Sequence, residues 1–479
     1  MQRSESRLRV PVVLIAALIA ATVLRVAAPA EAGGFEYPVQ GVHALGRGGA
    51  FTVKADDPSA IYWNPSRLAL LRGTRAIYNH NITRLNMRFE RQPLLCDCEL
   101  FEFPAVNEQQ GFFPMGISAA VSTDFGLEDW GFGLGLVGPT AIGSLRYPSG
   151  TTAPTRYSFI EAEMMVIFAT ISAAWKYEEL FGFGASLQFG FMPRLDYSMV
   201  VVGPGERSTA VATLSDLRAD ARASDPFRMT AIFSGWVRPL PYMELALSSR
   251  AVPINFNASG DIRMSAEPDS VFYGSDPFKV PASVKFTYPV NVQAGVRYFH
   301  ERASGEELFD IELNFVWEQW SQLDAFTLDF GVDEIDVFGS RIALQRIDIV
   351  RNFKDTYSVR LGGQWNVLPR LLTLRLGGLW ESAGLPHGYS SVDFPSFERF
   401  AISGGISVAW RGVELSLAYS RVFQLPRAVG TSEARLTQQR MTFEGEMVDG
   451  CPVNAGVYHS SYDVFAFGLG VHFNSLFSD

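Results

Sequence analysis

Seven charged residues fall on the face of predicted strands that lies opposite the apolar face. They are Arg297, Asp310, Glu312, Glu318, Arg360, Arg375 and Glu414. Charges of both signs on one face can pair with one another or hold water, and a network of ion pairs is the simpler interpretation for each of them. A carboxylate ligand would need one Arg or Lys beside an apolar pocket. The sequence leaves open which cation would serve.

Catalytic chemistry has little support in this chain. Neither a nucleophile elbow nor a zinc motif surrounds the histidines, which are His43, His80, His300, His387, His459 and His472. We therefore predict no enzymatic activity, no catalytic residue, no cofactor and no metal. The net charge of −10 and the pI near 5.3 argue against a nucleic-acid partner.

Period-two alternation predicts the elements that position these charges. Between Phe181 and Phe191 every second residue is apolar, and the residues between them are glycine, serine or glutamine. Such alternation is typical of a strand with one apolar and one polar face. Apolar residues make up 47% of the chain but are dispersed, with a mean hydropathy of +0.08. This pattern indicates a transmembrane β-barrel, whose side chains alternate between lipid and lumen.

We predict fourteen antiparallel strands, an even number as in single-chain bacterial barrels. They lie near 74–90, 112–123, 130–139, 163–177, 180–195, 227–238, 241–254, 283–299, 308–330, 355–366, 371–382, 398–410, 412–423 and 460–473. Short turns such as Glu178-Glu179 alternate with long connections, which is the asymmetry of periplasmic turns and extracellular loops. The stretch 317–330 is interpreted as part of one long strand, and 208–223 as a helical cover over the outer opening.

The first 32 residues predict a secretory signal peptide. Arg3 and Arg7 lie in a positive region, Val10–Leu24 is apolar, and Ala30-Glu31-Ala32 matches a cleavage site. The apolar run is shorter than the roughly 20 residues that a transmembrane helix needs. The predicted divisions are a signal peptide at 1–32, an N-terminal plug at 33–72 and a barrel with long extracellular loops at 73–479.

The segment Phe35–Leu71 is too glycine-rich for a stable helix and too apolar for a linker, so we predict a compact plug in the lumen. Its order of an Ala-Leu-Gly-Arg step, a paired Ala-Asp-Asp and a Trp-Asn-Pro resembles the N-terminal hatch of the FadL/TodX family of outer-membrane transporters. The residues that carry this part of the resemblance are Phe35, Leu45, Gly46, Arg47, Asp56, Asp57, Asn64 and Pro65. Ser66 stands where the family usually has alanine.

Three further stretches, 317–321, 353–362 and 395–404, are similar to family motifs rich in Trp, Phe, Asp and Gly. The resemblance implies an all-β, 14-stranded barrel in the bacterial outer membrane with a hatch in its lumen. It also implies passive, hatch-gated transport of hydrophobic compounds, above all long-chain fatty acids, with Phe35 near the ligand pocket. The implied partners are a hydrophobic small molecule, outer-membrane lipid and, during biogenesis, the barrel-assembly machinery.

The third predicted strand contains several glycines and ends at a proline. Proline cannot donate to a strand ladder and glycine weakens one, so pairing should fail locally around Gly135, Gly138 and Pro139. The alternative is an ordinary strand end before a loop. In the resembled family a kink in this strand opens a lateral port, which implies that the ligand leaves sideways into the membrane.

The three cysteines, Cys96, Cys98 and Cys451, fall in predicted external loops. The first and last strands of a closed barrel are neighbours, so a disulfide from Cys451 to Cys96 or Cys98 is compatible with an exported protein. A Cys-Asp-Cys metal site is the weaker alternative, because no further ligands match it. Two functional alternatives also stay open: a general diffusion porin, which should lack a hatch, and an uptake channel for aromatic hydrocarbons.

Overall fold

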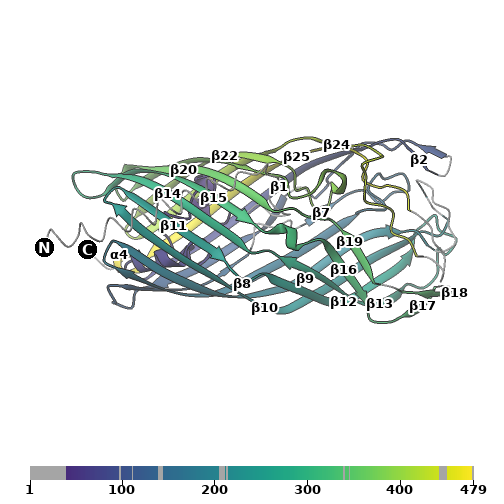
Figure 1. Cartoon of the computed structure of the whole chain (residues 1–479), viewed down its shortest axis with the longest axis horizontal. Helices are drawn as coiled ribbons and strands as arrows, with labels where there is room; N and C mark the ends of the chain where they lie inside the picture. Colours follow the sequence, from purple (N-terminus) through teal and green to yellow (C-terminus); the bar gives the residue numbers. More distant parts are fainter. Residues whose placement is uncertain are drawn as a thin grey trace.

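One closed antiparallel sheet forms a long barrel (Figure 1). The computed structural model describes residues 39–476, apart from 97–98, 111, 139–143, 204–210, 212–213, 338–339, 345 and 442–449. The strands β1 (Arg75–Arg91) and β25 (Gly456–His472) close the barrel and pair over their whole length. The prediction of an all-β, 14-stranded antiparallel barrel is confirmed. Among the described residues, no helix is long and apolar enough to cross a membrane.

Eight of the fourteen wall strands are continuous and six are divided in two. The continuous strands are β1, β5 (Phe112–Thr123), β8 (Glu161–Tyr177), β9 (Phe181–Val201), β10 (Leu217–Leu240), β21 (Leu372–Glu381), β22 (Arg399–Trp410) and β25. The divided ones are β6 (Trp130–Val137) with β7 (Ser144–Arg146), β11 (Met243–Arg250) with β12 (Ile254–Ala266), β13 (Phe278–Tyr288) with β14 (Asn291–Glu301), β15 (Glu307–Glu318) with β16 (Ala325–Phe330), β19 (Ile347–Val350) with β20 (Thr356–Leu368), and β23 (Val413–Gln424) with β24 (Arg427–Val429).

Shorter strands lie outside this count. The strand β4 (Val106–Asn107) pairs with β1, and two hairpins, β2 (Leu94–Cys96) with β3 (Glu99–Phe101) and β17 (Glu334–Val337) with β18 (Ser340–Ala343), stand apart from the wall sheet.

Proline and a short helix divide several wall strands. Pro253 separates β11 from β12 and Pro289 separates β13 from β14, since proline has no N–H for the ladder. The helix η2 (Trp320–Gln322) separates β15 from β16, so the prediction of one continuous strand over 308–330 is wrong, although the two pieces count as one wall strand. Asp355 stabilises this break, because its carboxylate accepts hydrogen bonds from Trp317 Nε1 and the Ser321 amide, both at 3.1 Å.

The strands β9 and β10 run for 21 and 24 residues, well beyond the roughly 9–11 that a spanning strand needs. The barrel therefore extends past the membrane at the end with the long connections, on the right in Figure 1. The predicted helical cover over 208–223 is wrong from Leu217 onward, where β10 pairs with β9 and β12. The alternating apolar residues of this stretch face inward, which favours a strand.

The outer face of the wall is apolar, as the alternation predicts. Leu376 and Leu415 are more than 60% exposed, and Trp410 is equally exposed beside a short turn. Such side chains are stable when lipid covers them. After β25 the chain turns into α4 (Phe473–Leu476), which lies at the end of the barrel that carries the short turns (Figure 1).

Residues 39–71 lie inside the barrel, next to the end with the short turns (Figure 1). They form α2 (Val42–Gly46), α3 (Ala60–Trp63) and η1 (Pro65–Leu70), all shorter than seven residues. Leu45, Phe51 and Trp63 are fully buried. A segment packed this way is consistent with the predicted hatch, and we call residues 39–71 the lumenal segment.

Candidate functional site

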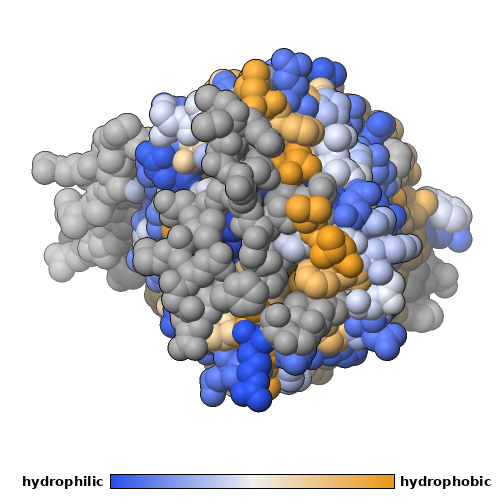
Figure 2. All heavy atoms as spheres, turned by 90° about the vertical axis from the view of Figure 1, so that its right-hand side faces the viewer, coloured by the Kyte–Doolittle hydropathy of each residue, from blue (hydrophilic) through white to orange (hydrophobic). Residues whose placement is uncertain are grey.

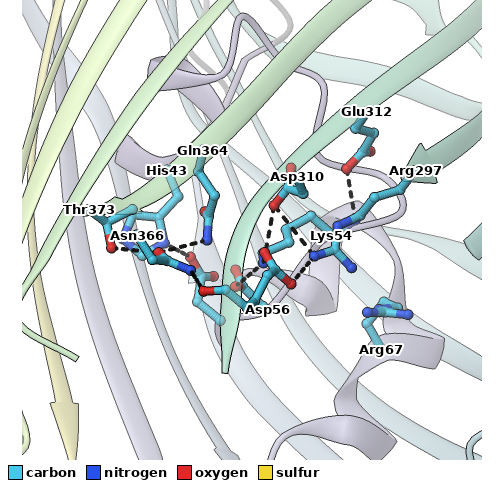
Figure 3. A network of polar contacts seen from close by, with 12 residues as sticks. His43, Lys54, Asp56, Arg67, Arg297, Asp310, Glu312, Gln364, Asn366 and Thr373 are labelled. Carbon is cyan, nitrogen blue, oxygen red and sulfur yellow. Dashed lines mark hydrogen bonds and ion pairs between the residues drawn. The ribbon is translucent and has the colours of Figure 1, made fainter. Parts of the chain in front are cut away.

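Buried ion pairs attach the lumenal segment to the barrel wall (Figure 3). Arg47 Nη2 lies 2.6 Å from Asp310 Oδ1 and 3.2 Å from Glu312 Oε2, and all three side chains are inaccessible to solvent. Glu312 also accepts hydrogen bonds from the backbone amides of Val53 and Lys54, at 2.7 and 2.9 Å. One wall carboxylate therefore binds a cation and two backbone donors of the segment.

A second set of pairs extends this network around Arg297. Lys54 Nζ is 2.5 Å from Glu307 Oε1 and 3.2 Å from Asp310 Oδ2. Arg297 lies 2.8 Å from Glu244, which also pairs with Arg67 of the segment at 3.2 Å. Three of the seven inward charges anticipated from the alternation, Asp310, Glu312 and Glu414, thus bind the lumenal segment.

His43 joins the segment to β23. Its Nδ1 lies 2.8 Å from Asp57 and its Nε2 lies 2.6 Å from Glu414. Burial and the nearby Arg375 lower the pKa of His43, but Glu414 and Asp57 raise it more, and the resulting pKa is about 9. His43 is therefore a cation at neutral pH. A polar cavity of about 570 Å³ lies beside it, between the segment and the wall.

The His43 contact should weaken in alkali. The folded-state pKa of about 9 exceeds the ordinary value of 6.5, so the stabilisation is complete below pH 6.5 and is lost as the pH rises through 9. The difference in unfolding free energy between the wild type and His43→Gln should fall by on the order of 3 kcal/mol between pH 6.5 and 10. Thermal unfolding in detergent at each pH measures it. A constant difference would contradict the assignment.

Glycines let the segment approach the wall closely. A β-carbon at Gly131 would lie 2.1 Å from Leu68 O, and one at Gly133 would lie 2.5 Å from Ile61 Cγ2. Gly48 has a φ of +64°, and a β-carbon there would lie 2.4 Å from Gly378 N. The glycines of β6 are thus explained by contact with the segment.

The glycines of the third strand are paired as far as the structure describes this strand, and the predicted lateral opening stays a prediction. Gly135 lies within the regular ladder, opposite Ala120 and Thr170. The described strand ends at Val137, the Gly138 amide donates to Ile117 O at 2.9 Å, and the next described pairing begins at Ser144. Pro139 lies outside the described residues.

The other predicted hatch residues have internal roles. Asn64 Nδ2 donates to Thr52 O at 2.8 Å, and Pro65 starts η1. A β-carbon at Gly46 would lie 3.1 Å from Gly405, and Asp56 pairs with Lys54 at 3.3 Å. None of these residues lines the apolar cavity described next, and Phe35 lies outside the described residues.

An apolar cavity of about 590 Å³ lies in the outer half of the barrel. Its wall comes from β8 to β10, β12, β13 and the segment from β16 to β19, and includes Met164, Met199, Val280, Phe286, Phe326 and Ile342. Arg351, paired with Asp393 at 2.6 Å, is one of few charged residues at its edge. The sequence did not predict this cavity, because the predicted strands 180–195 and 227–238 are too short. The alternation continues after residue 195 and before residue 227, and these extensions of β9 and β10 carry part of the cavity lining.

The structure describes only one side of the predicted disulfide. Cys451 is buried against Phe101 and Phe103 and takes part in a disulfide. The side chains of Cys96 and Cys98 lie outside the described part, so the pairing stays a prediction. Across the described residues, no group of three or more His, Cys, Asp or Glu side chains is arranged to hold a metal.

A closed barrel with an apolar cavity and an ion-paired lumenal segment defines an outer-membrane channel for hydrophobic compounds. A sequence model of the family described as outer membrane protein transport protein (OMPP1/FadL/TodX) matches residues 249–456. The matched part, a little under half of the chain, is similar to this FadL/TodX family of outer-membrane transporters of hydrophobic compounds. No curated protein sequence matches the chain.

Solved structures share the fold at low sequence identity. A FadL homologue from Pseudomonas aeruginosa superposes with a TM-score of 0.72 at 15% identity, over 92% of this chain and all of that chain. The toluene transporter TodX of Pseudomonas putida gives 0.63 at 14% identity, over 91% of this chain and 98% of its own. The CymD monoaromatic hydrocarbon channel gives 0.62 at 14% identity, over 92% and 99%.

Proposed function

We propose that this protein takes up long-chain fatty acids passively and releases them sideways through the wall at the third strand. The observation that carries the proposal is the place where the apolar cavity meets the wall. On β8, Glu163 pairs with Ser144 and Phe168 pairs with Val137. Met164, which lines the cavity, lies between these two paired positions. The cavity therefore borders the part of the wall between Val137 and Ser144, where we propose that the ligand leaves.

The surface at the end with the long connections would allow a hydrophobic solute to enter the barrel from outside. Figure 2 shows the end that carries the long connections, where a stripe of apolar side chains crosses a hydrophilic surface. A hydrophobic solute can adsorb there and enter the apolar cavity without an energy source, because transfer from water to an apolar site is favourable.

Movement straight through the barrel is opposed by the lumenal segment. Its core residues are fully buried and its cations are paired with the wall. Crossing it would require breaking buried ion pairs, whereas a sideways exit at Gly138 leads into lipid. The sideways route therefore suits an apolar solute.

The cavity has room for a solute much larger than a single aromatic ring, as a long-chain fatty acid is. Its volume of about 590 Å³ falls well inside the range of roughly 300–1,000 Å³ of sites for drug-sized ligands. The names of two structural relatives indicate monoaromatic hydrocarbons, so toluene is the second candidate substrate.

The test combines single-channel conductance of the refolded mature protein with binding of labelled palmitate. We expect silent bilayers, saturable palmitate binding and poor competition by toluene. Steady ion conductance without binding would favour a general porin, and strong competition by toluene would favour an aromatic-hydrocarbon channel.

A further inference from the structure

The connection between β21 and β22 folds into the outer half of the barrel. Most side chains over 382–398 are buried, and Leu385, Ser390 and Phe397 are inaccessible to solvent. Asp393 Oδ2 lies 3.0 Å from the hydroxyl of Tyr197 on β9. Five wall strands lie between β9 and β21 by the shorter way round the sheet. This connection therefore crosses the lumen.

Two points of the connection are fixed to the wall on its own side. The carbonyl of Ser390 accepts a hydrogen bond from the hydroxyl of Tyr458 at 3.2 Å. The carbonyl of Pro395 accepts one from Gln424 Nε2 at 2.7 Å. The four residues between them, 391–394, form neither helix nor strand. We call residues 391–394 the strap, because they run between two fixed points.

The strap borders the apolar cavity, since Asp393 and Phe394 both line it. Its partner Tyr197 also lines the cavity and pairs with Ala162 on β8, which in turn pairs with Leu145 on β7. The strap therefore contacts the side of the cavity that is next to the proposed exit at the third strand.

The charged contact that holds the strap is incomplete. Asp393 Oδ2 lies 2.6 Å from Arg351 Nη2, and both side chains are at most 5% exposed. Asp393 Oδ1 and Arg351 Nε are also buried, and among the described residues they have no hydrogen-bond partner. Arg156, between β7 and β8, pairs instead with both Asp216 and Glu267, at 3.0 and 2.9 Å. A buried pair with unsatisfied polar atoms gains little over its solvated state, so the Asp393 contact can open and close.

We infer that Asp393 is the latch of a gate inside the channel. Its contacts with Arg351 and Tyr197 hold the strap across the path from the apolar cavity to the exit, and the ligand passes when these contacts open. The inference rests on the proposed function and adds the residue that controls release. The apolar walls hold the ligand in both states of the gate, so the latch sets the rates of binding and release and leaves the affinity unchanged.

The experiment measures association and dissociation rates of a fluorescent fatty alcohol by stopped-flow mixing with the purified protein in detergent. The alcohol is neutral, so a changed charge beside the cavity does not act on it directly. Asp393→Asn should raise both rates by about tenfold and keep the Kd within about twofold of wild type. Arg351→Met should have the same effect, and the double variant no larger one, because either change opens the same latch.

Asp348→Asn is the matched control for the latch. It makes the same exchange of carboxylate for amide in an exposed pair, with Arg346 at 3.0 Å, and Arg346 lines the same cavity. Both rates should stay at the wild-type value in this variant.

Two results would overturn the latch and leave the proposed function intact: unchanged rates in Asp393→Asn, or weaker binding with an unchanged association rate, which would mean that Asp393 only shapes the cavity. A wild-type protein that binds neither palmitate nor the alcohol would overturn the proposed function and the latch with it. If Asp393→Asn fails to fold, Tyr197→Phe decides, because it removes one hydroxyl and keeps the ion pair. Both rates should then rise about threefold, as expected for one lost hydrogen bond, and unchanged rates would reject the gate.

Discussion

Replacing Glu312 by alanine is expected to convert a silent barrel into a conducting one. The substitution removes the carboxylate that binds Arg47 and the amides of Val53 and Lys54. Breaking a buried pair by removing one partner costs about 3–5 kcal/mol. Because these contacts hold the lumenal segment against the wall, we expect the loss to appear as detachment of the segment rather than unfolding of the barrel.

Single-channel recording of the purified variant measures this effect. The wild type should stay closed, and Glu312→Ala should show frequent ion-conducting openings. Glu90→Ala is the control, since Glu90 lies on β1, away from the lumenal network, and the pair of its largely exposed side chain with Arg88 contributes little. Silent bilayers from a correctly folded Glu312→Ala protein would show that the network does not hold the segment in place.

Much of the barrel could be predicted from the sequence, because one rule governs every strand. Lipid outside and polar or small groups inside impose period two, so the strand near 371–382 could be placed within a residue or two of β21. The count of fourteen followed from short turns alternating with long connections. The break at Trp320 could not be predicted, because it depends on Asp355, a partner 35 residues away.

The site was harder to predict because it depends on contacts between distant segments. The charges of Asp310 and Glu312 could be placed inside by alternation, yet their partners Arg47 and Lys54 come from a segment some 250 residues earlier. The glycines of β6 have two possible explanations, a weak strand or close packing, and only the position of Ile61 and Leu68 distinguishes them.

Converting the end of the third strand into a regular strand should stop transport. In the double variant Gly138→Val and Pro139→Thr, position 139 regains an amide donor and both residues favour extended backbone. Continued pairing beyond Val137 would cover the side of the cavity at Met164. We expect fatty-acid uptake by cells to fall more than tenfold, while palmitate binding to the purified protein stays within about twofold of wild type.

Measuring binding and uptake separately distinguishes a closed exit from a misfolded protein. A variant that merely misfolds loses both, whereas a closed wall retains a filled cavity whose ligand cannot leave. Gly404→Val provides the matched control: it adds the same side chain to β22, where a β-carbon would have one neighbour, at 3.8 Å. Normal uptake by a folded double variant would place the exit elsewhere, and conductance through the Glu312→Ala protein would then mark the axial path as the route to examine.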